Sequence, residues 1–533
     1  MGMFFNPGNS GFLSAVRSQI YVDKSDLIQF TNSAIGTEQR FICVSRPRRF
    51  GKSITVKMLA AYYSRGCDSG EIFQALKIAK SPAYEKELNK SNVISLDVQW
   101  FRSVAGTRGD ADRIVSYMQE EVIRELGQQY PDVVREGDIS LPEVLLRIHS
   151  RTGEQFVVLL DEWDCLFRED RQNRELQEAY LHFLRGMFKG GPAESYVKLA
   201  YMTGILPIKK YGTQSALNNF DEYTMARPAM LAKYVGFTEP EVKKLCRKYH
   251  MDFAEAKRWY DGYAFPKAAS VYSPNSVTEA MRREAFGNYW TGTETYEALQ
   301  FYIDLDEDGL KETLVQMLGG GNCVIDIGSF QNDMTSIKCR DDVLTLLVHL
   351  GYLAYDETRG SVSIPNEEIR QEFVRAVKGG KRKELAKLIR NSDQLLQDTL
   401  DGKAERVAKA IEKAHSAGTA PLFYNNEQAL RSVIKFAYIS AVEVFQEIQE
   451  LPSGTGYADI VYLPKKGSAM PVIVIELKWN KKTGSAIQQI MDRNYPQALE
   501  GMDTDILLVA ITYDEKTKKH TCQIETHSRT ETV

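Results

Sequence analysis

Residues 43–59 read CVSRPRRFGKSITVKML and end in the Gly-Lys-Ser triplet of a phosphate-binding loop. In the usual pattern, GxxxxGK followed by Ser or Thr, glycines let backbone N–H groups close around phosphates and the lysine reaches the outer ones. Gly51, Lys52 and Ser53 hold the last three places here, but Arg46 stands where the first glycine belongs. Only a strand before this loop and a helix after it would support a nucleotide site.

Both flanks of the loop have the required pattern. Residues 40–45, RFICVS, form a short apolar run of strand type, and helical spacing follows at Val56, Leu59, Ala60 and Tyr63. The helix start would add free N–H groups and its positive dipole end to the phosphate cradle. We therefore expect ATP to be held by Arg49, Phe50, Gly51, Lys52, Ser53 and Ile54.

A second strand-like run ends in two carboxylates. Residues 156–164, FVVLLDEWD, have the pattern of a buried strand that emerges at the carboxyl edge of a parallel sheet. A nucleotide site needs one carboxylate to hold Mg²⁺ and a group that orients the attacking water. We assign Asp161, together with the Ser53 hydroxyl, to the metal and Glu162 to the water as catalytic base.

Two other apolar runs complete the expected sheet. Residues 197–204, VKLAYMTG, place Thr203 at the same edge, where its hydroxyl would sense the γ-phosphate. Residues 92–98, NVISLDV, are expected to fill the remaining central position. Residues 1–235 are therefore predicted to form an α/β P-loop NTPase domain with a parallel sheet.

The ordered motifs of this region resemble a known family. The segments RPRRFGKS and LLDEWD are similar to the prokaryotic AAA-ATPase-like proteins, in which arginine in the first glycine's place is usual; the resemblance extends through YVDKSDLI, MTGILPI, GFTEPEV, WYDGYAF, VYSPNSV and YWTGT. This family membership would imply an ATPase. It leaves open whether Arg46, Arg48 and Arg49 contact phosphate or a partner, or form a solvated basic loop.

Length and composition exclude several classes of protein. At 533 residues the chain exceeds one hydrophobic core, so two to four domains are expected. A net charge of -4 gives no global positive field, and nucleic-acid binding would need a local groove. Seven scattered cysteines without a CxxC pair predict a reducing compartment, and the lack of an apolar run of about 18 residues predicts a cytoplasmic protein with no membrane partner.

Residues 236–390 read as a helical connector without a second phosphate loop. Within it, residues 341–373 have the order helix, strand, turn, strand, helix, which is typical of a winged-helix module. Such a module contacts DNA or transmits motion, and His349 on its first helix is expected to be a core residue. The basic stretch 375–390, interrupted by Gly-Gly, is either a linker that tracks a phosphate backbone or a solvated helix face.

Two strand-like runs near the C-terminus, GTGYADIVYLP (454–464) and PVIVIELKWNK (471–481), also carry charged residues: Asp459 begins the first strand, and Glu476 and Lys478 lie near the end of the second. Strand side chains alternate in direction, so Glu476 and Lys478 project from one face. Antiparallel pairing of the two runs would bring Asp459 close to Glu476. Two carboxylates beside a lysine can bind Mg²⁺ and steer a water toward phosphorus.

Asp459 followed by Glu476-Leu477-Lys478 resembles the PD-(D/E)XK nuclease superfamily. The resemblance implies a restriction-endonuclease-like α/β domain over residues 391–533 with the order αβββαβ, with Asp459 and Glu476 as metal ligands and Lys478 as a catalytic partner. It also implies a catalytic role for Glu427, an acidic residue on the upstream helix, and assigns further motif positions to Gly454, Gly456, Gln489 and Tyr495. Tyr457 stands where arginine is frequent, which removes one phosphate contact.

The leading hypothesis is an ATP-regulated, Mg²⁺-dependent endonuclease acting on nucleic acid, with DNA favoured over RNA, in defence or mobile-element biology. The alternative is an ATP-driven switch or scaffold whose inactive nuclease-like domain only binds nucleic acid or protein. In a third hypothesis the ATPase is inert and only the nuclease works. A homo-oligomer is also compatible with the sequence.

Overall fold

The computed structural model has two compact units, which are described separately. The first contains Met1–Thr293 and Val324–Asn366, and the second contains Glu294–Cys323 and Glu367–Val533. The structure describes residues 2–208, 210–211, 214–215, 217–290, 296–305, 309–331, 337–379, 383–417, 427–453, 456–465, 470–480 and 504–527. The three modules expected from the sequence, 1–235, 236–390 and 391–533, stay a prediction. No helix in the described ranges is long and apolar enough to cross a membrane.

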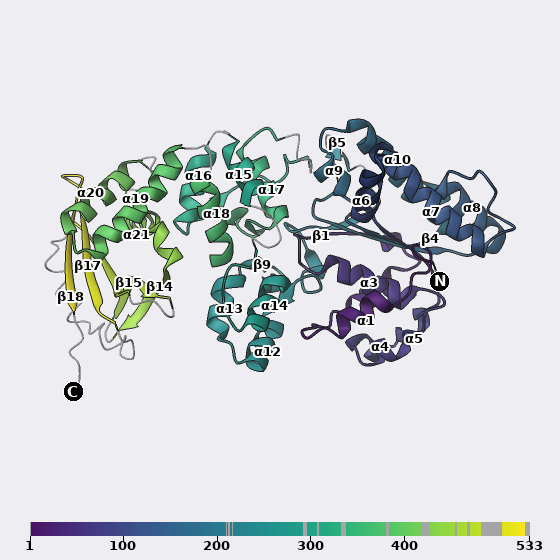
Figure 1. Cartoon of the computed structure of the whole chain (residues 1–533), viewed down its shortest axis with the longest axis horizontal. Helices are drawn as coiled ribbons and strands as arrows, with labels where there is room; N and C mark the ends of the chain where they lie inside the picture. Colours follow the sequence, from purple (N-terminus) through teal and green to yellow (C-terminus); the bar gives the residue numbers. More distant parts are fainter. Residues whose placement is uncertain are drawn as a thin grey trace. The chain divides into compact units, whose positions relative to one another are not determined.

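A five-stranded, all-parallel sheet forms the centre of the first unit (Figure 1). Its order is β2-β3-β4-β1-β7, with β2 (Asn92–Asp97), β3 (Phe156–Asp161), β4 (Val197–Gly204), β1 (Phe41–Ser45) and β7 (Asp221–Tyr223). The predicted parallel sheet is confirmed, and the four predicted strands are present. The central position expected for residues 92–98 is wrong, because β2 is the outermost strand beside β3. The position next to β1 is taken by β7, three partly polar residues without a strand-like run.

Helices cover both faces of this sheet (Figure 1). The helix that leaves the loop, α3 (Lys52–Tyr63), packs on β2, β3 and β4. Four helices bury the apolar residues of the opposite face: α6 (Val98–Arg108), α7 (Ile114–Gln129), α8 (Leu141–Thr152) and α10 (Arg174–Phe188). Shorter helices are α1 (Ser10–Val16), α2 (Leu27–Ala34), α4 (Gly70–Gln74), α5 (Tyr84–Glu87), α9 (Cys165–Glu169) and α11 (Gly191–Tyr196), and β5 (Lys210–Tyr211) pairs with β6 (Gln214–Ser215).

Part of the predicted connector packs within the first unit. Its elements are β8 (Phe237–Thr238), α12 (Glu239–Tyr249), α13 (Phe253–Tyr260), β9 (Tyr263–Phe265), β10 (Ala268–Tyr272), α14 (Pro274–Arg283), α17 (Arg340–Leu350), β12 (Ala354–Asp356) and β13 (Ser361–Ser363). Helix α17 is buried from Asp342 to Leu350, so it presents no exposed recognition surface. His349 is buried and stacks on Phe330, as expected of a core histidine. The winged-helix assignment itself stays a prediction.

The second unit combines helices with a mixed sheet. The sheet order is β14 (Phe445–Ser453), β15 (Gly456–Pro464), β16 (Val472–Trp479), β17 (Ile506–Asp514) and β18 (Lys519–His527). Only the β16–β17 pair is parallel. The helices are α15 (Tyr296–Asp304), α16 (Leu310–Leu318), α18 (Glu367–Gly379), α19 (Lys383–Leu400), α20 (Ala404–Ala417) and α21 (Glu427–Ala437), and the two-residue β11 (Cys323–Val324) lies at the sequence boundary between the units.

Candidate nucleotide site and candidate nuclease site

The loop between β1 and α3 has the backbone of a phosphate-binding turn. Gly51, directly before α3, has φ +92°, and Arg49 has φ +65°. A Cβ added at Gly51 would meet no atom within 4 Å. Glycine is therefore favoured there by the left-handed backbone and not by lack of space. The first N–H groups of α3 are left free by this turn, as an anion site at a helix start requires.

Arg46, in the place of the usual first glycine, supports the sheet edge. Its side chain is fully buried, and Nη1 donates to the carbonyl oxygens of Ser45 (2.8 Å), Tyr223 (3.0 Å) and Thr224 (3.1 Å). Burial lowers the pKa of this guanidinium to about 10, which still leaves it charged at neutral pH. Arg46 thus joins the carboxyl ends of β1 and β7 and is not part of a solvated loop. Arg48 and Arg49, by contrast, line a cavity.

Two other loop residues are enclosed by the connector. The Phe50 ring, 1% exposed, meets the Tyr263 ring edge-on with centroids 5.6 Å apart. The Tyr263 hydroxyl donates to the Gly351 carbonyl oxygen at 2.5 Å, and a Cβ at Gly351 would lie 2.6 Å from Pro47 Cγ. Pro47, Phe50, Tyr263 and Gly351 therefore form one packed cluster, which explains why the loop carries bulky residues where other loops carry glycine.

Tyr263→Phe tests this cluster. The substitution removes the donor to the buried Gly351 carbonyl, and an unsatisfied buried acceptor costs about 1–3 kcal/mol. We expect the calorimetric unfolding transition of the first unit to move down by several degrees. The matched control is Tyr289→Phe, since the Tyr289 hydroxyl makes an exposed local bond to Ala285 O and should matter little. Equal shifts for both variants would contradict a special role of the cluster.

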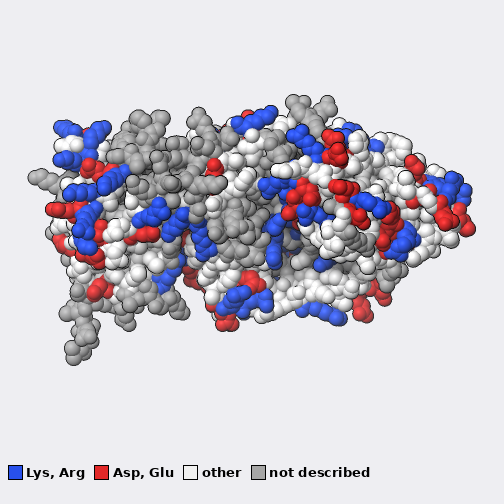
Figure 2. All heavy atoms as spheres, turned by 45° about the horizontal axis from the view of Figure 1, so that its top comes forward, with Lys and Arg blue, Asp and Glu red and all other residues white. Residues whose placement is uncertain are grey.

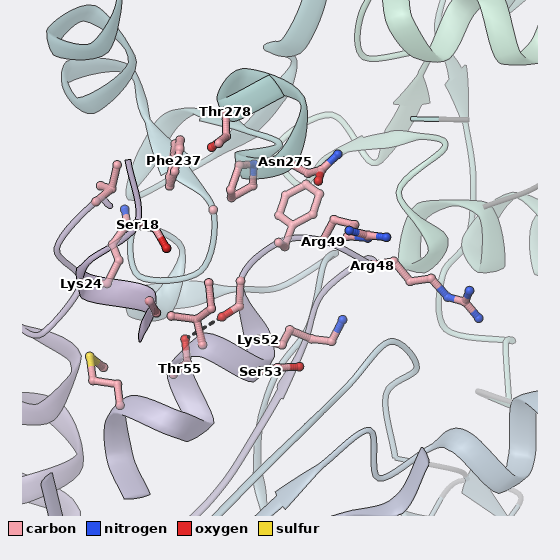
Figure 3. Close-up of a pocket in the computed structure, with 18 of the residues that line it drawn as sticks. Ser18, Lys24, Arg48, Arg49, Lys52, Ser53, Thr55, Phe237, Asn275 and Thr278 are labelled. Carbon is pink, nitrogen blue, oxygen red and sulfur yellow. Dashed lines mark hydrogen bonds between the residues drawn. The ribbon is translucent and has the colours of Figure 1, made fainter. Parts of the chain in front are cut away.

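A cavity of about 1140 Å³ opens beside the loop, enough space for a nucleoside triphosphate. All six predicted loop residues, Arg49 to Ile54, line it. Figure 3 shows Lys52 and Ser53 at the start of α3, with Arg48 and Arg49 before them. Phe237, Asn275 and Thr278 lie across the cavity, and Ser18 and Lys24 close its side (Figure 3). The sequence did not predict these last five residues, because they come from segments outside the phosphate motif.

The predicted metal residues lie at the same sheet edge. Asp161 ends β3 and is buried, and burial raises its pKa to about 6, against a lowering contribution from the Ser53 hydroxyl. Carboxylate and hydroxyl oxygens are suitable Mg²⁺ ligands, so these two residues fit the ion that the AAA-ATPase-like resemblance implies. Thr203 is the next-to-last residue of β4, but it is buried and is not among the residues that line the cavity, and its γ-phosphate role stays a prediction.

A pH profile tests the role of Asp161. Protons and Mg²⁺ compete for this carboxylate, and its raised pKa of about 6 makes the proton win as the pH falls through that value. We expect kcat/KM for ATP hydrolysis to be constant above this range and to fall about tenfold per pH unit below it. More Mg²⁺ should move the inflection to lower pH. A profile that is flat between about pH 5 and 7 would contradict this role.

Glu162, the predicted catalytic base, is held by two cations. Lys52 Nζ lies 3.6 Å from Oε1, and Arg168 Nη2 lies 2.5 Å from Oε2. Burial opposes ionisation of Glu162, but Lys52 and Arg168 outweigh it and lower the pKa of the carboxyl. Lys52 is itself only 4% exposed and donates to Pro47 O at 3.0 Å. Sequence reasoning missed Arg168, which lies six residues after Glu162, on α9 and beyond the end of the FVVLLDEWD segment.

The candidate nuclease residues meet where β15 and β16 pair. The strands are antiparallel, with Ile460 opposite Ile475, and one more step places Asp459 opposite Glu476. Leu477 N donates to Asp459 Oδ2 at 2.9 Å, and Lys478 Nζ lies 2.8 Å from Glu476 Oε1. The predicted antiparallel pairing and the shared face of Glu476 and Lys478 are therefore present.

A fourth side chain, Arg431 of α21, was not predicted at this site. Its Nη2 lies 2.6 Å from Asp459 Oδ1. One turn further along α21, Lys435 Nζ binds Glu447 Oε1 of β14 at 2.8 Å and so ties the helix to the sheet. Of the remaining motif positions, Glu427 begins α21 and Gly456 begins β15. Gly454, Gln489 and Tyr495 lie outside the described residues.

The donor chemistry of this site suits a hard cation. Asp459 and Glu476 offer carboxylate oxygens, the ligands preferred by Mg²⁺, and Lys478 stands beside them. Within the ranges that the structure describes, no group of three or more metal-ligating side chains occurs. Asp459 and Glu476 would hold Mg²⁺ through their carboxylates, and the ion would compete with Arg431 and Lys478 for these oxygens.

Comparisons with known proteins find two family matches in the chain. Residues 15–213 match the family described as Predicted AAA-ATPase, and residues 425–522 match the PD-(D/E)XK nuclease superfamily. An uncharacterized protein in the vnfD 5' region of Azotobacter chroococcum mcd 1 is 25% identical over 259 residues, 48% of each chain. The match therefore spans about half the length of that relative.

Among solved structures, the Aeropyrum pernix ORC2 protein in its ADPNP–ADP complexes gives a TM-score of 0.30 at 12% identity. That match covers 68% of this chain and 96% of the other. The two family matches coincide with the P-loop sheet and with the strands that carry Asp459 and Glu476. The chain therefore contains an AAA-ATPase-like domain in residues 15–213 and a domain of the PD-(D/E)XK nuclease superfamily in residues 425–522.

Proposed function

We propose that this protein is an ATP-regulated, Mg²⁺-dependent nuclease that cleaves DNA in preference to RNA. The observation that carries the proposal is the pairing of Asp459, Glu476 and Lys478 across β15 and β16 in a chain that also holds a P-loop cavity. Two carboxylates beside a lysine supply metal binding and charge stabilisation for a water that attacks phosphorus. ATP binding and hydrolysis at Lys52, Ser53, Asp161 and Glu162 would license this cleavage.

The charge distribution is consistent with a local nucleic-acid contact. The chain has a net charge of -4, and Figure 2 shows acidic and basic side chains interspersed over the face drawn. No broad basic field is available there to attract a nucleic acid from a distance. Binding would therefore depend on a groove near the cleavage site. The affinity for nucleic acid should fall as salt rises, with a modest slope because such a groove contacts few phosphates.

One incubation series tests the proposal. Purified full-length protein is mixed with supercoiled DNA, single-stranded DNA and RNA in the presence of Mg²⁺, with and without ATP. We expect nicking or cutting of DNA that depends on Mg²⁺, is changed by ATP and is stopped by a chelator. DNA and RNA that both remain intact under every condition would contradict the nuclease assignment.

A second candidate function is an ATP-driven switch whose nuclease-like domain binds without cutting. The observation that favours it is the engagement of both carboxylates by cations, Asp459 by Arg431 and Glu476 by Lys478. Retained ATP hydrolysis with intact DNA that nevertheless shifts on a native gel would support this function. A cytoplasmic defence or mobile-element setting, and a homo-oligomeric state, also belong to the proposal and rest on the domain combination alone.

A further inference from the structure

The Glu162 carboxylate bridges two buried cations that line the nucleotide cavity. One oxygen faces Lys52 Nζ and the other faces Arg168 Nη2, at 3.6 and 2.5 Å. Both cations are nearly inaccessible to bulk solvent, and both line the cavity. Lys52 is the residue expected to meet the outer phosphates. The Glu162 carboxylate, between Lys52 and Arg168, therefore lies where a terminal phosphate would be bound.

Arg168 is held in place independently of Glu162. Its Nε donates to Asp164 Oδ2 at 2.9 Å, and Asp164 is fully buried. The same carboxylate oxygen accepts from the backbone N–H groups of Ile205 (3.1 Å) and Leu206 (2.8 Å), just after β4. The guanidinium is thus fixed to the carboxyl edge of the sheet. If Glu162 moved away, Arg168 would still point into the cavity with its second N–H edge.

Glu162 itself is held in an unfavourable backbone conformation. Its φ is +51°, a left-handed value that residues with a Cβ seldom adopt. Such outliers persist where surrounding contacts determine them, and they occur often at sites that switch between two arrangements. Contacts with Lys52 and Arg168 hold this side chain, and the positive charge of Arg48 adds to them. If Glu162 lost either contact, its left-handed backbone conformation would be less stabilised.

We propose that Arg168 senses the terminal phosphate of ATP: it releases the Glu162 carboxylate and binds the phosphate in its place. The proposal rests on the ATPase function proposed above and names a residue that controls it. Two anions cannot share Lys52 and Arg168 without strong repulsion in a site of low dielectric constant. The terminal phosphate, which carries more charge and more acceptor oxygens than a carboxylate, takes both cations. Glu162 is then released to its predicted role.

The released carboxylate completes the chemistry. A water adds to the terminal phosphorus, the bond from phosphorus to the bridging oxygen of ADP breaks, and the proton of the water passes to Glu162. Arg168 and Lys52 neutralise the charge on the phosphate oxygens during transfer, as arginine residues do in other phosphoryl-transfer sites. ADP lacks the terminal phosphate, so with ADP bound the Glu162–Arg168 pair should remain.

Comparison of ATP and ADP binding tests this inference with Arg168→Gln in the full-length protein. We expect the affinity for a non-hydrolysable ATP analogue to fall about tenfold while the ADP affinity changes less than about twofold. The kcat for ATP should fall by about 10²–10³-fold. Arg168→Lys should recover part of the analogue affinity, because it restores the charge. Glu162→Gln should bind the analogue more tightly than wild type, since the competing carboxylate is gone.

The matched control is Arg102→Gln. Arg102 pairs with Asp170 at 2.6 Å and does not line the cavity, so the variant loses an arginine ion pair without touching the site. It should bind both nucleotides and hydrolyse ATP like wild type. Equal losses of ATP-analogue and ADP affinity in Arg168→Gln would mean a structural role and would overturn the inference, as would wild-type affinities for both. Wild-type protein that binds ATP without hydrolysing it would contradict the proposed ATPase, and the ratio of the two affinities would still decide on Arg168.

Discussion

Replacing Lys52 with alanine is expected to lower ATP hydrolysis by about 10²–10³-fold, because it removes the buried lysine of the phosphate loop that is expected to reach the outer phosphates. Lys52 lies at the first position of α3, and its ammonium group is buried between Pro47 O and the Glu162 carboxylate. Water cannot replace this charge in a buried site, so the terminal phosphate loses a charge-assisted contact in the ground state and in the transition state. Phosphate release at saturating ATP and equilibrium binding of ATP measure the two losses.

Lys57→Ala is the matched control for this experiment. Lys57 lies on the same helix, is exposed and does not line the cavity, so its removal should leave hydrolysis unchanged. Hydrolysis by Lys52→Ala at the wild-type rate would place the ATPase elsewhere. The same variant also tests coupling. If Lys52→Ala stops ATP hydrolysis but cleaves DNA like wild type under all ATP conditions, the nuclease works without the ATPase and the regulatory part of the proposal is wrong.

The central sheet of the first unit could be predicted from local patterns. Strands β1, β3 and β4 are buried apolar runs, and β3 ends in Asp161 at the sheet edge where the site lies. The position of β2 at the edge and the presence of β7 could not be predicted in this way. Strand order depends on how the chain crosses between strands, and the Asp221–Tyr223 strand is too short and too polar to show a period.

The unusual composition of the phosphate loop needed the structure for its explanation. Arg46 is directed to carbonyl groups of Tyr223 and Thr224, almost 180 residues further along the chain. Pro47 and Phe50 pack on Gly351 and Tyr263, which are more distant still. A sequence pattern relates only residues that are close along the chain, within a few turns of one helix or within one strand. Sequence reasoning therefore recognised the triplet that meets phosphate and left the arginines open.

The nuclease site also could be predicted only in part from local sequence patterns. Alternation along β16 and a single turn between two runs were enough to predict that Asp459, Glu476 and Lys478 share one place. Arg431 comes from a helix that packs on the sheet, and the rotation of α21 against β15 is set by contacts such as Lys435–Glu447. Those contacts have no local signature, so the cation that holds Asp459 was not foreseen.

Lys478→Ala is expected to lower DNA cleavage by about 10²–10³-fold, the largest effect expected in the second unit. Lys478 is the described cation within contact distance of Glu476, and it is the group placed to stabilise charge on the attacked phosphate. Glu476 is only 1% exposed, and a buried charge that loses its partner destabilises a fold by about 3–5 kcal/mol. Cleavage at saturating Mg²⁺ must therefore be measured together with the unfolding temperature.

Asp459→Asn separates these two effects. It leaves the Glu476–Lys478 pair intact and removes the charge of one expected metal ligand, and the Arg431 side chain is partly exposed, so water can solvate it. This variant should therefore lose cleavage with little loss of stability. Lys409→Ala, at an exposed position on α20, should change neither property. If Lys478→Ala and Asp459→Asn both remain folded and both nick DNA at the wild-type rate, the carboxylates and the lysine are not the cleavage site. The Arg431 and Lys478 contacts would then be the structural pairs of a domain that binds without cutting.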